Sequence, residues 1–290
     1  MRIRLIVNPT AGRGNGLYLA KRLENFLVTR GVRTETVRTN QKGDALRAAA
    51  QPDVDCVVVV GGDGTVNEVA NGIGQSGIPM ALLPAGTANA IARELHIPKS
   101  PETLGELILR NQTRTIDAGL CGNRRFLLCG GAGPDAAVIH YVHKKRKGRL
   151  GVTGYLLPVL LVMTKYSFPS FRVTLDDYET FDGIQYAVIA NCKYSAGIFP
   201  ATREASVADG LLDLVMFHNL NIVRLAGYAA RSFFGSLATS KDVIYRKVKT
   251  VIMEPLEEPS IHFQLDGDPA GFLPVTIEIE TCAMKIIAPD

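Results

Sequence analysis

A glycine-rich turn with an acidic residue at its centre is the stretch of this sequence best suited to chemistry. A run of four valines leads directly into Gly61, Gly62, Asp63, Gly64 and Thr65. Glycines after a strand let the backbone approach a ligand, and the N-terminus of the next helix offers unpaired N–H groups to an anion. Because a carboxylate repels phosphate unless a cation lies between them, the turn predicts a nucleoside triphosphate bound with Mg²⁺. The alternative is a plain strand-to-helix loop in which Asp-Gly only forms the turn.

Two other turns carry the same small and polar residue types, at 8–12 and at 84–89. Each follows a short apolar segment with the pattern of a buried strand. In a parallel sheet the carboxyl ends of the strands lie at one edge, which is where ligands bind. We therefore expect all three turns to meet at one site.

Two acidic segments in the second half of the chain leave a choice between structure and chemistry. Asp266, Gly267 and Asp268 follow alternating apolar residues, the pattern of a hairpin with an Asp-Gly turn. Two carboxylates at a strand end are also suited to take a proton from a substrate hydroxyl. The segment ADGLLD at 208–213 poses the same choice between a turn and a site for a hard metal ion.

Two further patterns are weaker. His140 and His143 share one helical face, but no third metal ligand accompanies them, so we interpret both as surface polar residues. The segment 131–136 matches a GxGxxA dinucleotide fingerprint, yet Leu156 stands where an acid for the ribose would be due. No P-loop, HExxH or GxSxG motif occurs in the sequence.

These residues need a scaffold, and the first third of the chain predicts alternating strands and helices. Thr65 is expected to cap the helix after the glycine-rich turn, because Glu68 follows at the spacing of a capping box. Strands that alternate with helices predict a parallel sheet. The apolar patterns place strands at 2–7, 33–38, 57–60 and 79–83, and further helices at 17–29, 44–50, 87–95 and 103–110.

From about residue 115 the pattern changes to short apolar segments separated by Asp, Gly and Asn. This pattern predicts an antiparallel β domain. We expect two domains, a boundary near 115–120 and a ligand site in the cleft between them. The predicted strands of this half are at 125–129, 172–175, 185–190 and 212–217, with more between 243 and 287.

The composition is that of a globular protein. Of the 290 residues, 47% are hydrophobic and 21% are charged, so disorder is not expected. Five cysteines without a CxxC pair predict a reducing compartment and no disulfide framework. Residues 1–8 lack the apolar core of a signal peptide, and the longest apolar stretch, 152–163, is too short to span a bilayer. We therefore expect a cytoplasmic protein.

The net charge of +4 is too small to indicate nucleic acid, but the basic residues are unevenly distributed. A basic cluster stands just before the apolar stretch and consists of Lys144, Lys145, Arg146, Lys147 and Arg149. Such a cluster beside apolar residues is suited to an anionic membrane surface, where each cation contributes about 1 kcal/mol. The alternative is a solvated loop before a core helix. No aromatic residues interleave with the cluster, so nucleic-acid binding is not expected.

Several segments, in the same order along the chain, resemble the diacylglycerol kinase catalytic-domain family of lipid kinases, which includes bacterial diacylglycerol kinases, sphingosine kinases and ceramide kinases. The segments are VNPTAGRG (7–14), GGDGTVNEVANGI (61–73), LPAGTANAIARELHIP (83–98), DAG (117–119), ADGLLDL (208–214) and LDGDP (265–269). The resemblance implies an N-terminal α/β nucleotide-binding domain with a parallel sheet, at 1–117, and a C-terminal antiparallel β-sandwich domain for the lipid substrate, at 118–277. It also implies that residues 278–290 pack back on the first domain and that the active site lies in the interdomain cleft.

The resemblance further implies roles for individual residues. Asp268 matches the proton acceptor, with Asp266 beside it, and Asp63 completes the implied catalytic set. The residues implied for ATP are Asn8, Pro9, Thr10, Ala11, Gly12, Thr39, Gly62, Asp63, Gly64, Thr65, Val66, Asn67, Glu68 and Thr87, and those for Mg²⁺ are Ser206, Asp209 and Leu211. Two positions depart from the family: Asp268 is one methylene shorter than the usual Glu, and Ala90 stands where bacterial members often have Asp.

The implied function is ATP- and Mg²⁺-dependent phosphorylation of the hydroxyl of a membrane lipid, such as diacylglycerol or a sphingoid or ceramide lipid. The enzyme would be cytoplasmic and peripherally associated with the membrane, and homodimerisation stays open. NAD kinase, which shares the GGDGT turn, is an alternative, although Asn67 and Glu68 follow here as in lipid kinases. A non-catalytic nucleotide- or lipid-binding regulator is the alternative from another class.

Overall fold

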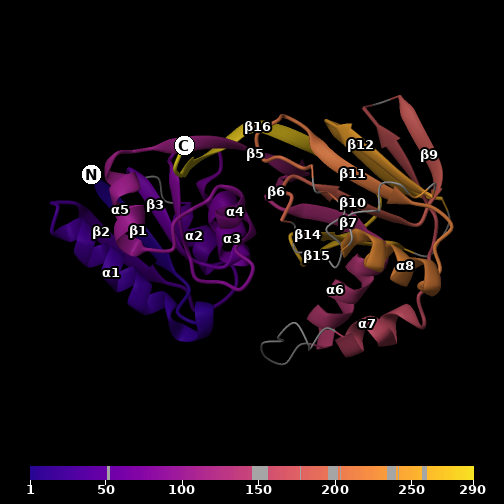
Figure 1. Ribbon diagram of the computed structural model, residues 1–290, viewed down its shortest axis with the longest axis horizontal. Coiled ribbons are helices and arrows are strands. Elements are labelled where there is room, and N and C mark those ends of the chain that lie inside the picture. The colour runs from indigo at the N-terminus through magenta and orange to yellow at the C-terminus, as the bar shows by residue number, and fades with distance from the viewer. Residues whose placement is uncertain are drawn as a thin grey trace. The chain divides into compact units, whose positions relative to one another are not determined.

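The computed structural model describes residues 1–50, 53–145, 156–176, 178–194, 202, 204–233, 240, 242–256 and 260–290 (Figure 1). The chain divides into two compact units. The first unit consists of Met1–Ala118 together with Glu280–Asp290, and the second of Gly119–Ile279.

A parallel sheet forms the centre of the first unit, with strand order β2–β1–β3–β4, and the end of β16 pairs with β4 in the same direction. Every residue of β3 is buried, as expected of a β-branched run in the middle of a parallel sheet. The predicted α/β fold with a parallel sheet is thus confirmed. The strands are β1 (Arg2–Val7), β2 (Arg33–Arg38), β3 (Cys56–Gly61), β4 (Met80–Pro84) and β16 (Val275–Ile287).

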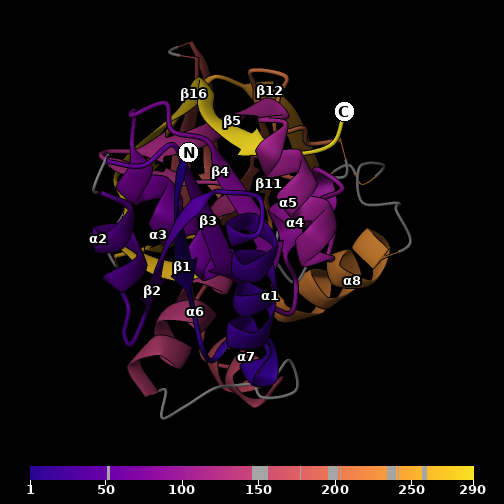
Figure 2. The same cartoon turned by 90° about the vertical axis from the view of Figure 1, so that its left-hand side faces the viewer.

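Helices cover both faces of this sheet. The helix α1 packs against α5, and α2 packs against α3, and Figure 2 shows the two pairs on opposite sides of β1 and β3. The helical elements are η1 (Ala11–Gly14, a 3₁₀ turn), α1 (Gly16–Val28), α2 (Asp44–Ala49), α3 (Asp63–Ile73), α4 (Ala90–Glu94) and α5 (Pro101–Leu109).

Among the helix starts of this unit, those of α3 and α4 differ most from the sequence prediction. The helix α3 begins at Asp63 with Gly62 as its N-cap, so Thr65 lies inside the helix and the predicted capping box does not form. The Thr65 hydroxyl instead accepts a hydrogen bond from the Asn8 side chain at 3.3 Å. The helix α4 begins at Ala90, three residues later than predicted, because the preceding residue Asn89 adopts a left-handed conformation with φ of 47°.

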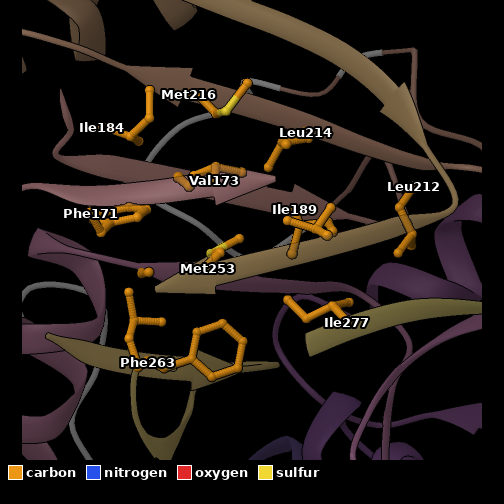
Figure 3. Packing of buried hydrophobic residues seen from close by; sticks show 14 of the residues in the cluster. Phe171, Val173, Ile184, Ile189, Leu212, Leu214, Met216, Met253, Phe263 and Ile277 are labelled. Carbon is orange, nitrogen blue, oxygen red and sulfur yellow. The ribbon is translucent and has the colours of Figure 1, made fainter. Parts of the chain in front are cut away.

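Two antiparallel sheets pack face to face in the second unit, as the predicted β-sandwich requires. One has the order β12–β11–β10–β7–β14–β15, and the other contains β13 between β8 and the start of β16, with β9 beside β8. Figure 3 shows the core between them, in which Phe171, Val173, Ile189, Met253 and Phe263 are buried. The strand β5 (Thr113–Cys121) begins in the first unit and ends in the second. The other strands are β6 (Arg124–Phe126), β7 (Cys129–Ala132), β8 (Phe171–Leu175), β9 (Glu179–Ile184), β10 (Tyr186–Ala190), β11 (Leu212–Phe217), β12 (Val243–Val248), β13 (Thr250–Pro255), β14 (His262–Leu265) and β15 (Asp268–Phe272).

Three helices complete the second unit: α6 (Pro134–Lys145), α7 (Leu156–Met163) and α8 (Ile222–Phe233). The helix α6 packs on β14 and β15 and also contacts α7. Among the residues described, none of the helices has the length and apolar character needed to cross a bilayer. Of the basic cluster, Arg146, Lys147 and Arg149 lie outside the described residues.

Candidate active site

The three glycine-containing turns meet at the carboxyl edge of the parallel sheet, as the sequence predicted. A Cβ atom on Gly12 would lie 2.5 Å from the carbonyl oxygen of Ala85, which joins the first turn to the third. A Cβ on Gly86 would lie 2.5 Å from the Cα of Gly62, which joins the third turn to the second. Such approaches are open only to residues without a side chain. The turns therefore form one surface made largely of backbone atoms.

Asn89 holds the third turn in shape. Its side-chain oxygen accepts a hydrogen bond from the Gly86 N–H at 2.9 Å, and its side-chain nitrogen donates to the Gly86 carbonyl at 2.8 Å. Both bonds close the loop on itself, which explains the left-handed backbone of Asn89. The result is a fixed start for α4, whose first residue is Ala90.

The carboxylate of Asp63 links the second turn to the start of α4. Its Oδ1 accepts a hydrogen bond from the backbone N–H of Ala90 at 2.7 Å. Burial raises the pKa of this carboxyl, while the N–H groups of Ala90 and Asn89 oppose that shift. Asp63 is thus a partly enclosed oxygen ligand beside the glycine backbone, and its oxygens suit a hard cation such as Mg²⁺.

The other residues predicted for ATP lie along the same edge. Thr39 follows β2 and donates its backbone N–H to the Val7 carbonyl at 2.9 Å, so it is held beside the first turn. Thr10, Gly12, Gly64 and Thr87 are exposed, whereas Val66 is buried in the helix. A small cavity behind the turns, lined in part by Asp63 and Asn89, has a volume of about 10 Å³. That volume holds about one water molecule, so a nucleotide would lie on the exposed surface of the turns.

The second unit presents Asp266 and Gly267 as the two-residue turn between β14 and β15. Both have positive φ, 50° and 80°, which is the conformation of a type I′ hairpin turn. The Asp266 carboxylate accepts backbone hydrogen bonds from Leu127, Leu128 and Cys129 at 2.9, 2.9 and 3.0 Å. These bonds correct one prediction: the strand expected at 125–129 is split into β6 and β7, because its central N–H groups bind this side chain instead of a neighbouring strand.

Asp268 begins β15 on the far side of that turn and faces two basic side chains. His143 Nε2 lies 3.4 Å from Oδ1 of Asp268, and Arg124 Nη2 lies 3.6 Å from Oδ2. The side chain of Asp268 is 30% exposed, so a substrate can reach it. Arg124 also donates to the carbonyl groups of Leu265 and Pro269, one on either side of the turn.

A polar pair, formed by Gln264 of β14 and Asp135 of α6, supports the same turn. Gln264 accepts a hydrogen bond from the Gly267 N–H at 3.0 Å and donates to Asp135 on α6 at 3.2 Å. Burial raises the pKa of the Asp135 carboxyl to about 6, against the opposing hydrogen bonds from Ala136 and Gln264. The turn is therefore held by α6 as well as by its own hairpin.

The residues predicted to hold Mg²⁺ in the second unit do not fit a divalent cation as they stand. The ammonium group of Lys247 lies 2.7 Å from Oδ2 of Asp209 and 3.9 Å from Oδ2 of the buried Asp213. The other oxygen of Asp209 accepts a hydrogen bond from the Leu211 N–H. The Ser206 hydroxyl accepts one from the Ala208 N–H. Within the described part of the chain, no group of three or more His, Cys, Asp or Glu side chains is placed so that it could hold a metal ion. Lys247 supplies the positive charge here.

Comparison with known proteins places this geometry in a family. The model of the diacylglycerol kinase catalytic domain matches residues 2–121, and the model of the YegS C-terminal NAD kinase beta sandwich-like domain matches residues 130–288. The chain belongs to the diacylglycerol kinase catalytic-domain family. Membership in this family identifies the chain as a lipid kinase. That activity is consistent with the two sites described above, which are the three glycine-containing turns of the first unit and the Asp266-Gly267 turn of the second.

Relatives of this kinase match over nearly its whole length. The diacylglycerol kinase of Bacillus subtilis (strain 168) is 29% identical over 286 residues, which cover 94% of this chain and 91% of the relative. That of Staphylococcus haemolyticus (strain JCSC1435) is 28% identical, with 98% and 88% covered. A solved diacylglycerol kinase from Bacillus anthracis str. Sterne has a TM-score of 0.74 at 23% identity and covers 99% of this chain and 97% of its own. That likeness supports the fold.

Some residues of the kinase site were missed by sequence reasoning. His143 was interpreted as a surface residue, yet it lies beside Asp268. Its position in the sequence, more than a hundred residues before that turn, gives no sign of the contact. Asn89 had a readable signal, since an Asn at the end of a Gly-Thr-Ala-Asn turn is suited to a left-handed conformation. Lys247 lies on β12 and carried no signal linking it to Asp209.

Proposed function

We propose that this kinase transfers the γ-phosphoryl group of ATP to the primary hydroxyl of a membrane lipid, with diacylglycerol as the acceptor. The observation that carries the proposal is the meeting of three backbone-lined turns around Asp63 within a chain of the diacylglycerol kinase family. The names of its relatives support diacylglycerol over a sphingoid base or ceramide.

The first unit would bind the nucleotide. The N-terminus of α3 and the glycine backbone of the three turns offer N–H groups to phosphate oxygens. Mg²⁺ supplies charge neutralisation on the phosphates when it is bound with ATP. Asp63 is the residue of the turns that would hold the ion, because its carboxylate lies beside the backbone N–H of Ala90, which directly follows the third turn. Thr10 and Thr87, both exposed, would donate further hydrogen bonds.

The second unit would handle the lipid hydroxyl. Its hydroxyl proton has to be removed as the bond to phosphorus forms, and a carboxylate at a strand end is suited to that task. Asp268 is accessible, whereas the Asp266 carboxylate already accepts three backbone hydrogen bonds. Asp266 therefore serves to hold the turn in this proposal, and Asp268 faces the substrate.

Membrane attachment would use the same unit. Lys144 and Lys145 end α6 and are exposed. At the start of α8, Ile222 and Val223 are 42% and 77% exposed, and Arg224 follows them. Apolar and cationic residues together suit an anionic bilayer surface at the cytoplasmic face. Charge reversal at Lys144, Lys145 and Lys147 should reduce binding to vesicles that contain phosphatidylglycerol; unchanged binding and salt dependence would count against this part of the proposal.

The experiment that tests the proposal is transfer of labelled γ-phosphate from ATP and Mg²⁺ to lipids in mixed micelles. Diacylglycerol, sphingosine, ceramide and NAD are offered separately, and Asp268→Ala serves as the control. Label on diacylglycerol that is lost in the variant is the expected result. Label on NAD alone would replace the proposal with NAD kinase, and ATP binding without any transfer would favour a regulator.

A further inference from the structure

We propose that His143 is a catalytic residue of this kinase, which takes the proton from the lipid hydroxyl while Asp268 orients its imidazole ring. The inference rests on the proposed function and deepens it. It assigns to a residue of α6 a step that the carboxylate of Asp268 would otherwise perform alone.

The two oxygens of Asp268 have different neighbours. Oδ1 faces His143 Nε2 at 3.4 Å, and Oδ2 faces Arg124 Nη2 at 3.6 Å. One oxygen is thus next to a fixed positive charge, and the other is next to an imidazole ring, which has one nitrogen to donate and one to accept a proton. Catalytic hydrogen bonds are often long before substrate binds and then shorten, so 3.4 Å is compatible with a functional pair.

The helix α6 is held on the hairpin so that His143 stays at this place. Near its start, Asp135 accepts a hydrogen bond from Gln264 of β14. In its middle, the ring of His140 lies 4.4 Å from that of His262 and 6.0 Å from that of Phe272. One helical turn after His140 comes His143, at the level of the turn between β14 and β15. The contacts of Asp135 and His140 therefore hold α6 so that His143 lies beside Asp268.

A carboxylate paired with an imidazole is an arrangement suited to general-base catalysis. The carboxylate fixes the ring and the tautomer, with N–H directed at the carboxylate, and the other ring nitrogen takes the proton. At 30% exposed, the His143 side chain can reach a substrate and return the proton to water.

The step balances without a further reactant. The lipid O–H bond breaks and its proton passes to the ring nitrogen of His143 that faces away from Asp268. The lipid oxygen forms a bond to the γ-phosphorus of ATP, and the bond from that phosphorus to the bridging β–γ oxygen breaks. ADP leaves with that electron pair, and the imidazolium then releases its proton to solvent.

The test compares His143→Gln with His218→Gln, which makes the same change in the same unit at a histidine outside the site. Phosphoryl transfer to diacylglycerol is measured in mixed micelles, with thermal unfolding to verify that both variants fold. We expect His143→Gln to lower kcat by roughly 10²–10⁴-fold, with KM for ATP and lipid changed by no more than about threefold. His218→Gln should keep kcat within about threefold of the unmodified enzyme.

A second variant separates proton transfer from simple positioning. His143→Ala should regain at least about a tenth of the lost rate when free imidazole is added, because a small base can then occupy the vacated space. A His143→Gln enzyme with unreduced kcat would overturn the inference, and so would a His143→Ala enzyme that imidazole does not rescue. An unmodified enzyme that phosphorylates no lipid would contradict the proposed function itself, which is a different result from an active enzyme indifferent to His143.

Discussion

The two turn-based sites of this kinase are built in different ways. In the first unit, the turns are brought together by backbone contacts between glycines, such as Gly62 with Gly86, and by one carboxylate on a helix N–H. In the second unit, the hairpin turn at Asp266 is held by side chains from β6, β14 and α6. The site in the first unit keeps its shape only if the residues at the close contacts have no side chain. The site in the second unit keeps its shape only if side chains from remote parts of the sequence stay in place. The comparison predicts different sensitivities to mutation.

The largest loss of stability is expected from Asp266→Asn. The carboxylate accepts three backbone hydrogen bonds, and an amide offers one oxygen to them and places an N–H₂ group against the remaining N–H donors. Unfolding in urea should show a loss of about 4 kcal/mol. Asp182→Asn is the control in the same unit, because its ion pair with Arg172 is exposed and should contribute less than about 1 kcal/mol. Equal effects of the two substitutions would contradict the role given to Asp266.

Asp135→Asn tests the support beneath the same turn through the pH dependence of stability. Burial raises the folded-state pKa of Asp135 to about 6, above the ordinary value of 3.8. The protonated carboxyl therefore contributes to the free energy of unfolding below about pH 4, and this contribution is lost as the pH rises through 6. The free energy of unfolding of the variant should therefore improve relative to the unmodified protein between about pH 4 and 7, by about 3 kcal/mol. A pH-independent difference between the two proteins would show that Asp135 does not titrate in this way.

Gly86→Ala tests the site in the first unit. Its added Cβ would lie 2.5 Å from the Cα of Gly62 and 2.8 Å from the side-chain oxygen of Asn89, so the second and third turns would have to separate. We expect a loss of about 2 kcal/mol in the free energy of unfolding, with weaker ATP binding. Gly64→Ala is the matched comparison for stability, because its Cβ would meet nothing within 4 Å and a helical Ala is favoured over Gly. If Gly86→Ala is as stable as Gly64→Ala, the turns are not in contact.

The smallest effect is expected at Asp209. Because Lys247 lies 2.7 Å from its carboxylate, Mg²⁺ should raise the Tm of the unmodified protein no more than that of Asp209→Asn. The loss of the partly exposed ion pair itself should cost about 1 kcal/mol or less. A Tm increase with Mg²⁺ that the Asp209→Asn variant lacks would restore the metal site implied by the resemblance.

The sequence predicted most of the first unit because its signals are local. The strands β1 and β2 have the predicted bounds, and the valine run of β3 is buried throughout. The start of α4 was missed because Asn89 bonds its own loop instead of leading a helix. The capping box at Thr65 was missed because its hydroxyl bonds Asn8 in another turn. The first error arises from a local side-chain bond within the turn, and the second from a tertiary contact that overrides a local pattern.

The second unit was less predictable for the same physical reason. Its Asp266-Gly267 turn was readable from two residues, and the type I′ conformation confirms it. The partners of that turn are remote: the N–H groups at 127–129 and the basic groups Arg124 and His143 come from elements more than a hundred residues earlier. No spacing rule connects such residues, so only the folded structure shows what surrounds Asp268.

The division of labour between the two units is the central claim, and it can be measured with two conservative variants. Asp63→Asn and Asp268→Asn are compared for ATP affinity by calorimetry in the presence of Mg²⁺ and for phosphoryl transfer to diacylglycerol. We expect Asp63→Asn to weaken ATP binding at least about tenfold. Asp268→Asn should bind ATP within about threefold of the unmodified enzyme while kcat falls roughly 10²–10⁴-fold. Normal turnover in Asp268→Asn, or normal ATP affinity in Asp63→Asn, would contradict the account.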